Sequence, residues 1–279
     1  MIFILAIIFF TLGLIIGSFL NVVIYRINTQ KSFLGSFGGR SACMSCQNRL
    51  SWYELIPLFS FLSLKGRCLN CKTKISIQYP LVELATGLIF SFLFLKLQDI
   101  FYSNIFLFAI TYAYYATAFS LLVVIAVYDL KHKIILDILS FIFGALAFAG
   151  LFFFNSSALP AHAWQAGFYI HTPSILEFLS GVFIALPFAL FWFISGGRWM
   201  GLGDAKLALG IGWLLGFASA LSGLVAAFWS GAIIGVTLVI LSKNSKIRRM
   251  GMKSEIPFAP FLVFGALLAF LFELHLFVV

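Results

Sequence analysis

The chain has 279 residues, of which 62% are hydrophobic and 10% are charged, and its formal net charge is +9. Soluble globular domains carry about 25% charged residues, so this composition excludes an ordinary soluble protein and favours a membrane protein. The positive charge does not by itself indicate a nucleic-acid partner, because basic residues also mark the cytoplasmic loops of membrane proteins.

Apolar segments recur along the chain at lengths that suit transmembrane helices, which need about 20 apolar residues to cross a bilayer. The first segment lacks a basic region ahead of its apolar run, so we interpret it as a transmembrane helix and not as a cleaved signal peptide. The sixth segment is short and rich in glycine. Eight spans are predicted, at residues 2–24, 79–97, 104–127, 134–154, 176–195, 205–216, 219–241 and 257–278. The sequence therefore predicts an all-α polytopic membrane protein with about eight transmembrane helices.

Lysine and arginine residues are distributed unevenly between the predicted loops. Eight of the 18 lie between the first and second spans, and of the other ten only Lys96 falls on the opposite side of the membrane. Since cytoplasmic loops carry the basic excess, we expect both termini outside and the 25–78 loop in the cytoplasm, close to anionic lipid. The loop at 155–175 has no Lys or Arg and is expected outside, where its aromatic residues suit the membrane interface. We expect no nucleic-acid partner.

All four cysteines of the chain lie in the 25–78 loop. Cys43 and Cys46 form one CxxC motif, and Cys68 and Cys71 form a second after 21 intervening residues. This spacing is typical of a zinc ribbon, in which four thiolates complete a closed tetrahedral shell around a structural ion. Two disulfides or four free thiols are the alternatives, and disulfides are disfavoured in a reducing cytoplasm. The sequence predicts a small zinc-ribbon-like domain that is stabilised by its metal.

Two aspartates lie at the ends of predicted spans on the same side of the membrane. Asp129 ends the apolar run ATAFSLLVVIAVYD, and Asp204 begins the sixth span in GLGDAKLALGIGWLLG. An ionisable group at a membrane span is costly and is therefore a candidate functional residue. Two carboxyl groups at one depth can share a proton, so that one activates water and the other protonates a leaving group. This pattern favours an aspartic peptidase, although Asp204 alone also suits a helix N-cap.

Residues close to the two aspartates suggest supporting roles. Gly201 and Gly203 are expected to adopt backbone conformations that a helix interior disfavours, next to a water-filled cavity. Asp137, near the start of the fourth span, is interpreted as a helix-start or supporting residue. Lys131 and Lys206 each follow one of the aspartates by two residues and can bias the titration of the pair.

Glu83 lies about one turn inside the second span, in YPLVELATG. It is either a buried functional carboxylate or the partner of an arginine at the membrane interface, and we favour the arginine pair. The four histidines form no metal-binding spacing.

Five motifs follow one another along nearly the whole chain: GSFLNVVIYR (17–26), the CxxC pair, DLKHKIILD (129–137), GLGDAK (201–206) and IPFAPFLVFG (256–265). In their order and spacing, these motifs resemble those of the type IV prepilin peptidases, integral-membrane aspartic peptidases of the GxGD type. Leu136 stands where the family has a proline, and Ala259 stands where it has a glycine.

The resemblance implies that Asp129 and Asp204 are the catalytic pair. It implies removal of a short basic leader from prepilins and pseudopilins at the cytoplasmic face of the bacterial inner membrane, and N-methylation of the new N-terminus with S-adenosylmethionine. Pilus assembly, type II secretion and DNA uptake all use such substrates. No residue is assigned to the methyl donor. The expected domains are the first transmembrane helix at 1–24, the zinc-binding domain at 25–78 and the peptidase domain at 79–279.

Two other classes of function are compatible with part of the sequence. A proton-coupled secondary transporter uses intramembrane carboxylates as proton relays, but the chain shows no convincing internal repeat, and both aspartates lie at one edge of the membrane. A membrane assembly scaffold with a zinc domain explains the cysteines and leaves both aspartates unexplained. Cleavage of a prepilin by the purified protein distinguishes the peptidase from both alternatives.

Overall fold

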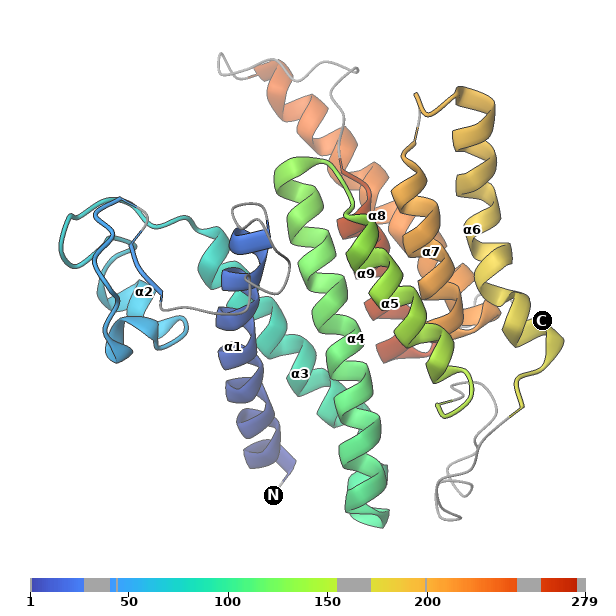
Figure 1. Ribbon diagram of the computed structural model, residues 1–279, viewed down its shortest axis with the longest axis horizontal. Coiled ribbons are helices and arrows are strands. Elements are labelled where there is room, and N and C mark those ends of the chain that lie inside the picture. The colour runs from blue at the N-terminus through green and yellow to red at the C-terminus, as the bar shows by residue number, and fades with distance from the viewer. Residues whose placement is uncertain are drawn as a thin grey trace. The chain divides into compact units, whose positions relative to one another are not determined.

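The computed structural model describes residues 2–27, 41–43, 45–154, 172–198, 200–244 and 257–274. Within these residues the regular structure is helical, with two isolated β-bridges and no strand. The predicted all-α architecture is thereby confirmed (Figure 1). The helices are α1 (Ile2–Ile27), η2 (Trp52–Leu55), α2 (Phe59–Ser63), α3 (Gln78–Ser103), α4 (Ile105–His132), α5 (Asp137–Gly150), α6 (Ile175–Ser195), α7 (Leu202–Leu215), α8 (Phe217–Asn244) and α9 (Ala259–Phe272).

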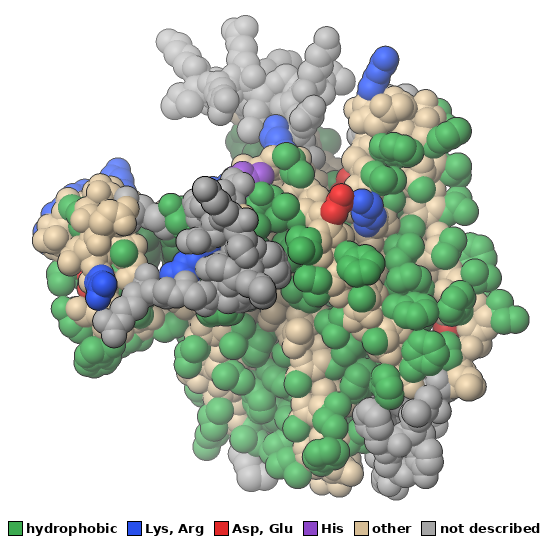
Figure 2. Space-filling model, in the orientation of Figure 1, with side chains coloured by type: hydrophobic (Ala, Val, Ile, Leu, Met, Phe, Trp, Pro, Cys, Tyr) green, Lys and Arg blue, Asp and Glu red, His purple; other side chains and the backbone are tan. Residues whose placement is uncertain are grey.

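Each of the eight predicted spans corresponds to a helix. Among the described residues, α1, α3, α4, α6 and α8 are long and apolar enough to cross a membrane, so the chain is a multi-pass membrane protein. Helices α5, α7 and α9 have 14 residues each, which gives a length of about 21 Å against about 30 Å for the hydrocarbon core. Apolar side chains cover much of the helical surface in Figure 2.

The chain forms two compact units, the first made of residues 1–98 and 115–124 and the second of residues 99–114 and 125–279. In the first unit, α1 and α3 pack with their backbones in close contact. A Cβ atom added at Gly17 would lie 2.8 Å from Cα of Glu83, and one at Gly13 would lie 2.7 Å from the carbonyl oxygen of Thr86. Small residues allow transmembrane helices to approach in this way, which accounts for the glycine before the SFLN segment.

The cysteine-containing region of the first unit consists of two turns with the same geometry, connected by η2 and α2. The N–H of Gln47 donates to the carbonyl of Cys43, and the N–H of Lys72 donates to the carbonyl of Cys68. Gln47 and Lys72 both have left-handed backbones, with φ of 57° and 58°. The two CxxC motifs are therefore equivalent knuckles.

In the second unit, α7 is the central helix and contacts α5, α6, α8 and α9. Its glycines allow this packing, because a Cβ atom at Gly212 would lie 2.6 Å from Cα of Gly181 on α6. The hydroxyl of Ser180 on α6 donates to the carbonyl of Gly212 at 2.9 Å. The glycine-rich sixth segment is thus a short helix buried by its neighbours.

Candidate active site

Asp129 lies in the last turn of α4, and only 5% of its surface is exposed. Its Oδ2 atom accepts a hydrogen bond from the backbone N–H of Ala259 at 3.3 Å. Ala259 is the first residue of α9, where backbone N–H groups lack partners within the helix and carry partial positive charge. The IPFAPFLVFG motif therefore places the N-terminus of α9 next to Asp129. Because the donor is a backbone group, alanine makes the same bond as the glycine that the family has there.

Asp204 lies in the first turn of α7, three residues after the N-cap residue Gly201. The N–H of Asp204 donates to the carbonyl of Gly201 at 3.2 Å, and the Asp204 carboxyl group also hydrogen-bonds to the backbone of Gly201. Asp204 is therefore not the N-cap itself. Its carboxyl group folds back over the start of the helix.

The expectation of a backbone conformation that a helix interior disfavours is confirmed for Gly201 and wrong for Gly203. Gly201 is extended, with φ of −77° and ψ of 148°, and Gly203 is an ordinary helical residue. The reason for glycine at position 203 is space, because a Cβ atom there would lie 2.8 Å from Cβ of Ile135 in the α4–α5 connection. Gly203 thus lets the start of α7 approach the segment that follows Asp129.

The structure brings the two aspartates together in the second unit, where the charge of Asp129 acts on the carboxyl group of Asp204. Asp129 is buried and Asp204 is partly buried. Two carboxylates held close in such surroundings do not both ionise readily. This is the requirement for one carboxylate and one carboxylic acid to act at one site.

Lys206 and Asp137 form an ion pair next to this site. Nζ of Lys206 on α7 lies 2.6 Å from Oδ1 of Asp137, the first residue of α5, and both side chains are exposed. The direct partner of Lys206 is therefore Asp137, which supports the interpretation of Asp137 as a helix-start and supporting residue. The ion pair connects the segment after Asp129 with the segment after Asp204.

Leu136 retains the backbone conformation that a proline would impose. It is the N-cap of α5, with φ of −71° and ψ of 122°. Proline fixes φ near −65°, so the departure from the family motif leaves this turn unchanged.

The four cysteines form a cluster in which all four sulfur atoms lie within 4.8 Å of one another. The Sγ atoms of Cys43 and Cys71, from different knuckles, are 3.7 Å apart, and the four thiols form no disulfide. A tetrahedral zinc site with Zn–S bonds of about 2.3 Å requires sulfur–sulfur distances of about 3.8 Å. The cluster can therefore hold one tetrahedral ion.

One cysteine of the second knuckle, Cys71, favours the thiolate form, which is the form that binds metal. The side chain of Thr73 hydrogen-bonds to the sulfur of Cys71 at 3.2 Å. This bond, together with one from the Thr73 backbone, lowers the pKa of Cys71 to about 6.

Within the described residues, Glu83 pairs with a backbone N–H and a serine in place of the expected arginine. Its Oε2 atom accepts a hydrogen bond from the backbone N–H of Leu58 at 2.8 Å, and its carboxyl group also hydrogen-bonds to Ser18. Glu83 is buried and connects α3 with the start of α2 in the cysteine-containing region. No sequence signal indicates this contact, because a backbone N–H is present at almost every residue.

Some predicted features lie outside the described residues. They include most of the 155–175 loop, the basic residues at 246–253 and the first residue of the IPFAPFLVFG motif.

Comparison with known proteins finds peptidase family matches in the two parts of the chain that contain the cysteines and the aspartates. Residues 11–97 match the bacterial peptidase A24 N-terminal domain, and residues 116–236 match the type IV leader peptidase family. A prepilin leader peptidase/N-methyltransferase of Myxococcus xanthus is 33% identical over 252 residues, which cover 90% of this chain and 68% of the relative. The protein of that name from Bacillus subtilis is 31% identical over 270 residues, covering 95% of this chain and 93% of the relative.

No solved structure matches the chain. The first family match contains the four cysteines and Glu83, and the second contains Asp129 and Asp204. With this order of domains, and with relatives of over 30% identity along most of its length, the chain belongs to the type IV leader peptidase family.

Proposed function

We propose that this protein is an aspartic endopeptidase that removes the short basic leader from type IV prepilins and pseudopilins, with Asp129 and Asp204 as its catalytic pair. The observation that carries the proposal is that two aspartates from separate helices, α4 and α7, lie close enough for the charge of one to act on the other. The curated relatives are named prepilin leader peptidase/N-methyltransferase, which supports this substrate class.

The mechanism requires one proton shared between Asp129 and Asp204. The ionised carboxylate removes a proton from water as the water oxygen attacks the scissile carbonyl carbon. The protonated carboxyl group then gives its proton to the amide nitrogen as the C–N bond breaks. The leader leaves with a new carboxylate and the mature protein with a free α-amino group. The two residues titrate as a unit, so neither has a fixed role as acid or base.

The contact from Ala259 places the N-terminus of α9 at Asp129. A hydrogen bond from a helix N-terminus stabilises the ionised form of the carboxylate that accepts it. Asp129 receives this bond through Oδ2. Asp204 accepts a backbone hydrogen bond at Gly201, the N-cap of α7, so each member of the pair receives one such bond.

The four cysteines hold a structural zinc ion in this proposal. Four thiolates saturate a tetrahedral ion and leave no position for water, so the ion stabilises the small domain and takes no part in peptide cleavage. The sulfur–sulfur distances and the lowered pKa of Cys71 support this role.

The basic residues support an orientation in the bacterial inner membrane. With both termini outside and the cysteine-containing domain in the cytoplasm, both aspartates lie at the cytoplasmic face. A basic substrate leader stays on that side for the same electrostatic reason, so the scissile bond and the aspartates meet at the membrane boundary.

A second activity is proposed from the name that the relatives share. The α-amino group freed by cleavage accepts a methyl group from S-adenosylmethionine in an N-methyltransferase reaction. The residues that bind the donor are not assigned.

The test is cleavage of a purified prepilin by the full-length protein in detergent, compared with Asp129→Asn and Asp204→Asn. Each substitution should abolish leader removal and leave the zinc content unchanged. Asp137→Asn is the matched control and should retain cleavage. Methyl donor labelled on its methyl group, added to the wild-type reaction, should label the cleaved product. Wild-type protein that leaves the prepilin intact would overturn the proposal.

A further inference from the structure

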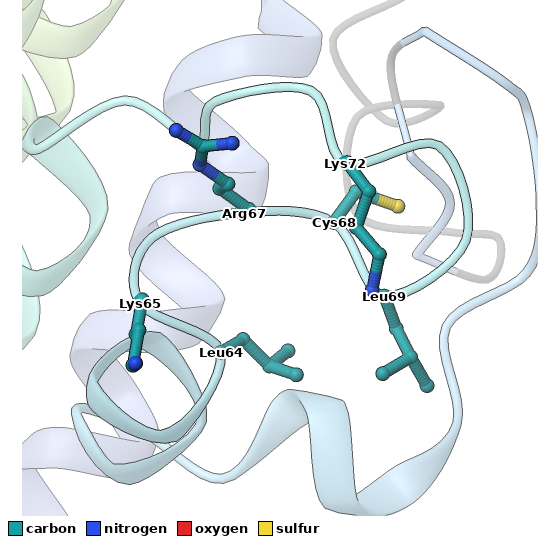
Figure 3. Close-up of a pocket in the computed structure, with 6 residues that line it drawn as sticks. All are labelled: Leu64, Lys65, Arg67, Cys68, Leu69 and Lys72. Carbon is teal, nitrogen blue, oxygen red and sulfur yellow. The ribbon is translucent and has the colours of Figure 1, made fainter.

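A cavity of about 410 Å³ opens beside the second cysteine knuckle. Figure 3 shows its lining residues around one loop, with Lys65 and Arg67 on one side and Lys72 next to Leu69 on the other. None of the described residues that line this cavity is acidic. It combines positive charge with apolar side chains, and it is lined by Leu64, Lys65, Arg67, Cys68, Leu69 and Lys72.

The three cations of the cavity have no protein partner in the part of the chain that the structure describes. Lys65, Arg67 and Lys72 are exposed, and none of their side chains takes part in an ion pair or hydrogen bond with another described residue. Three positive charges at one cavity attract an anion, and salt weakens that attraction because the charges are exposed. The cavity therefore suits a phosphate group, which accepts several hydrogen bonds from Lys and Arg at once.

The cavity belongs to a domain that is held against the membrane. The 28–77 segment connects the end of α1 to the start of α3, which are both long enough to span the bilayer. The hydrogen bond from Leu58 to Glu83 reaches a residue about 8 Å along the axis from the start of α3 at Gln78. The start of α2 thus lies at the level of the first turns of a transmembrane helix.

The same domain also exposes large apolar side chains. Trp52 is 77% exposed, Leu62 is 72% exposed and Phe59 is 66% exposed. Such side chains lie favourably in the interfacial region of a bilayer, where basic residues contact the headgroups. Figure 2 shows basic and apolar side chains together on this domain.

We propose that this cavity binds the phosphate group of an anionic phospholipid, with Lys65, Arg67 and Lys72 around the headgroup and Trp52, Phe59 and Leu62 in the adjacent interface. An acidic protein segment would satisfy the cations but would leave the exposed apolar side chains without a partner. A bilayer satisfies both, because it offers anionic headgroups above an apolar layer. The small domain is then a lipid-binding module as well as a metal-binding one.

The test measures lipid binding by the full-length, zinc-loaded protein in neutral detergent. Phosphatidylglycerol is titrated against phosphatidylcholine, and retained lipids are counted by native mass spectrometry. The cavity variant is Arg67→Gln/Lys72→Gln. The matched control is Arg49→Gln/Lys74→Gln, which removes one Arg and one Lys from the same domain outside the cavity lining.

The proposal predicts that wild type prefers phosphatidylglycerol and that added salt weakens the binding. Each cation near an anionic headgroup contributes about fivefold in affinity, so the cavity variant should bind about 25-fold more weakly. The control should change less than about fivefold, because its cations do not line the cavity. Zinc content should be the same in all three proteins, which shows that the domain remains folded.

Three results would overturn the proposal. Equal losses in both variants would mean that the domain attracts anions by its overall charge. An acidic peptide or inorganic phosphate that displaces phosphatidylglycerol at equal concentration would identify a different ligand. A wild type with no preference between the two lipids would remove the basis for a headgroup site.

Discussion

The cysteine cluster and the aspartate pair differ in how the chain assembles them. Cys43 and Cys71 are 28 positions apart, and two equivalent turns present the four sulfurs. The aspartate site combines α4 and α7 with the first residue of α9, which lies 130 positions from Asp129. The cluster depends on local turns and on its metal, whereas the aspartate site depends on close packing between helices. Substitutions that change helix spacing should therefore affect cleavage, and those at the knuckles should affect metal binding.

Among substitutions outside the aspartate pair, the largest effect is expected for Gly203→Ala. The new Cβ atom would lie 2.8 Å from Cβ of Ile135, so the start of α7 must move away from the segment after Asp129. Since misplacement of a catalytic group by about 1 Å can cost about 100-fold in rate, kcat for prepilin cleavage should fall by about that factor.

Gly201→Ala is the matched control for this change. A Cβ atom at position 201 would meet nothing closer than Oδ2 of Asp204 at 3.8 Å, an ordinary contact. Its kcat should stay within about threefold of wild type, because surface substitutions without new contacts cost little. Equal loss in both variants would contradict the role of close packing.

A smaller effect is expected for Ala259→Pro, which removes the N–H that donates to Asp129. Proline suits the first position of a helix, so α9 should still form. A hydrogen bond to a charged group contributes about 1.5–3 kcal/mol, and this one is long, so kcat should fall about tenfold. Ala259→Gly retains the donor and should cleave at the wild-type rate. Unchanged cleavage by the proline variant would show that this hydrogen bond has no role in the reaction.

Thr73→Val should change zinc binding at the second cysteine knuckle and leave prepilin cleavage unchanged. Thr73 lowers the pKa of Cys71 to about 6 by hydrogen-bonding to its sulfur. A lowered pKa keeps the thiolate as pH falls, so loss of Thr73 allows protonation at higher pH. Zinc release measured with a colorimetric chelator should therefore begin at a higher pH in the variant, while cleavage at neutral pH stays at the wild-type rate. Release at the same pH as wild type would contradict the role of Thr73.

The smallest effect is expected for Leu136→Pro. The backbone of Leu136 already has φ of −71°, and no described group accepts a hydrogen bond from its N–H. Proline at a compatible position stabilises a protein by about 0.4–1 kcal/mol, because it restricts the unfolded chain. Thermal unfolding in detergent should shift upward by a few degrees, with cleavage unchanged. A lower unfolding temperature would show that the turn does not tolerate proline.

The sequence predicts the residues of both sites, because their signals are compositional and local. Two CxxC motifs identify the cysteine cluster, and Asp129 and Asp204 are conspicuous at the ends of apolar segments. The helices follow from the length of those segments, although α5 and α9 are shorter than the apolar runs suggest.

The contacts that position these residues could not be predicted. The bonds from Ala259 to Asp129 and from Leu58 to Glu83 use backbone N–H groups, which carry no residue-specific signal. The role of Gly203 is also invisible in sequence, because glycine serves both unusual backbone angles and close approach. Only the packing of α7 against the α4–α5 connection decides between these two roles.

The most direct test of the aspartate pair is the cleavage rate of Asp129→Asn, Asp204→Asn and the double variant, measured on one prepilin at equal zinc content. Residues that act as a unit give non-additive losses, so each single variant should lose as much activity as the double variant, about 1,000-fold or more. A single variant that retains a substantial fraction of wild-type activity, or losses that multiply in the double variant, would contradict the account.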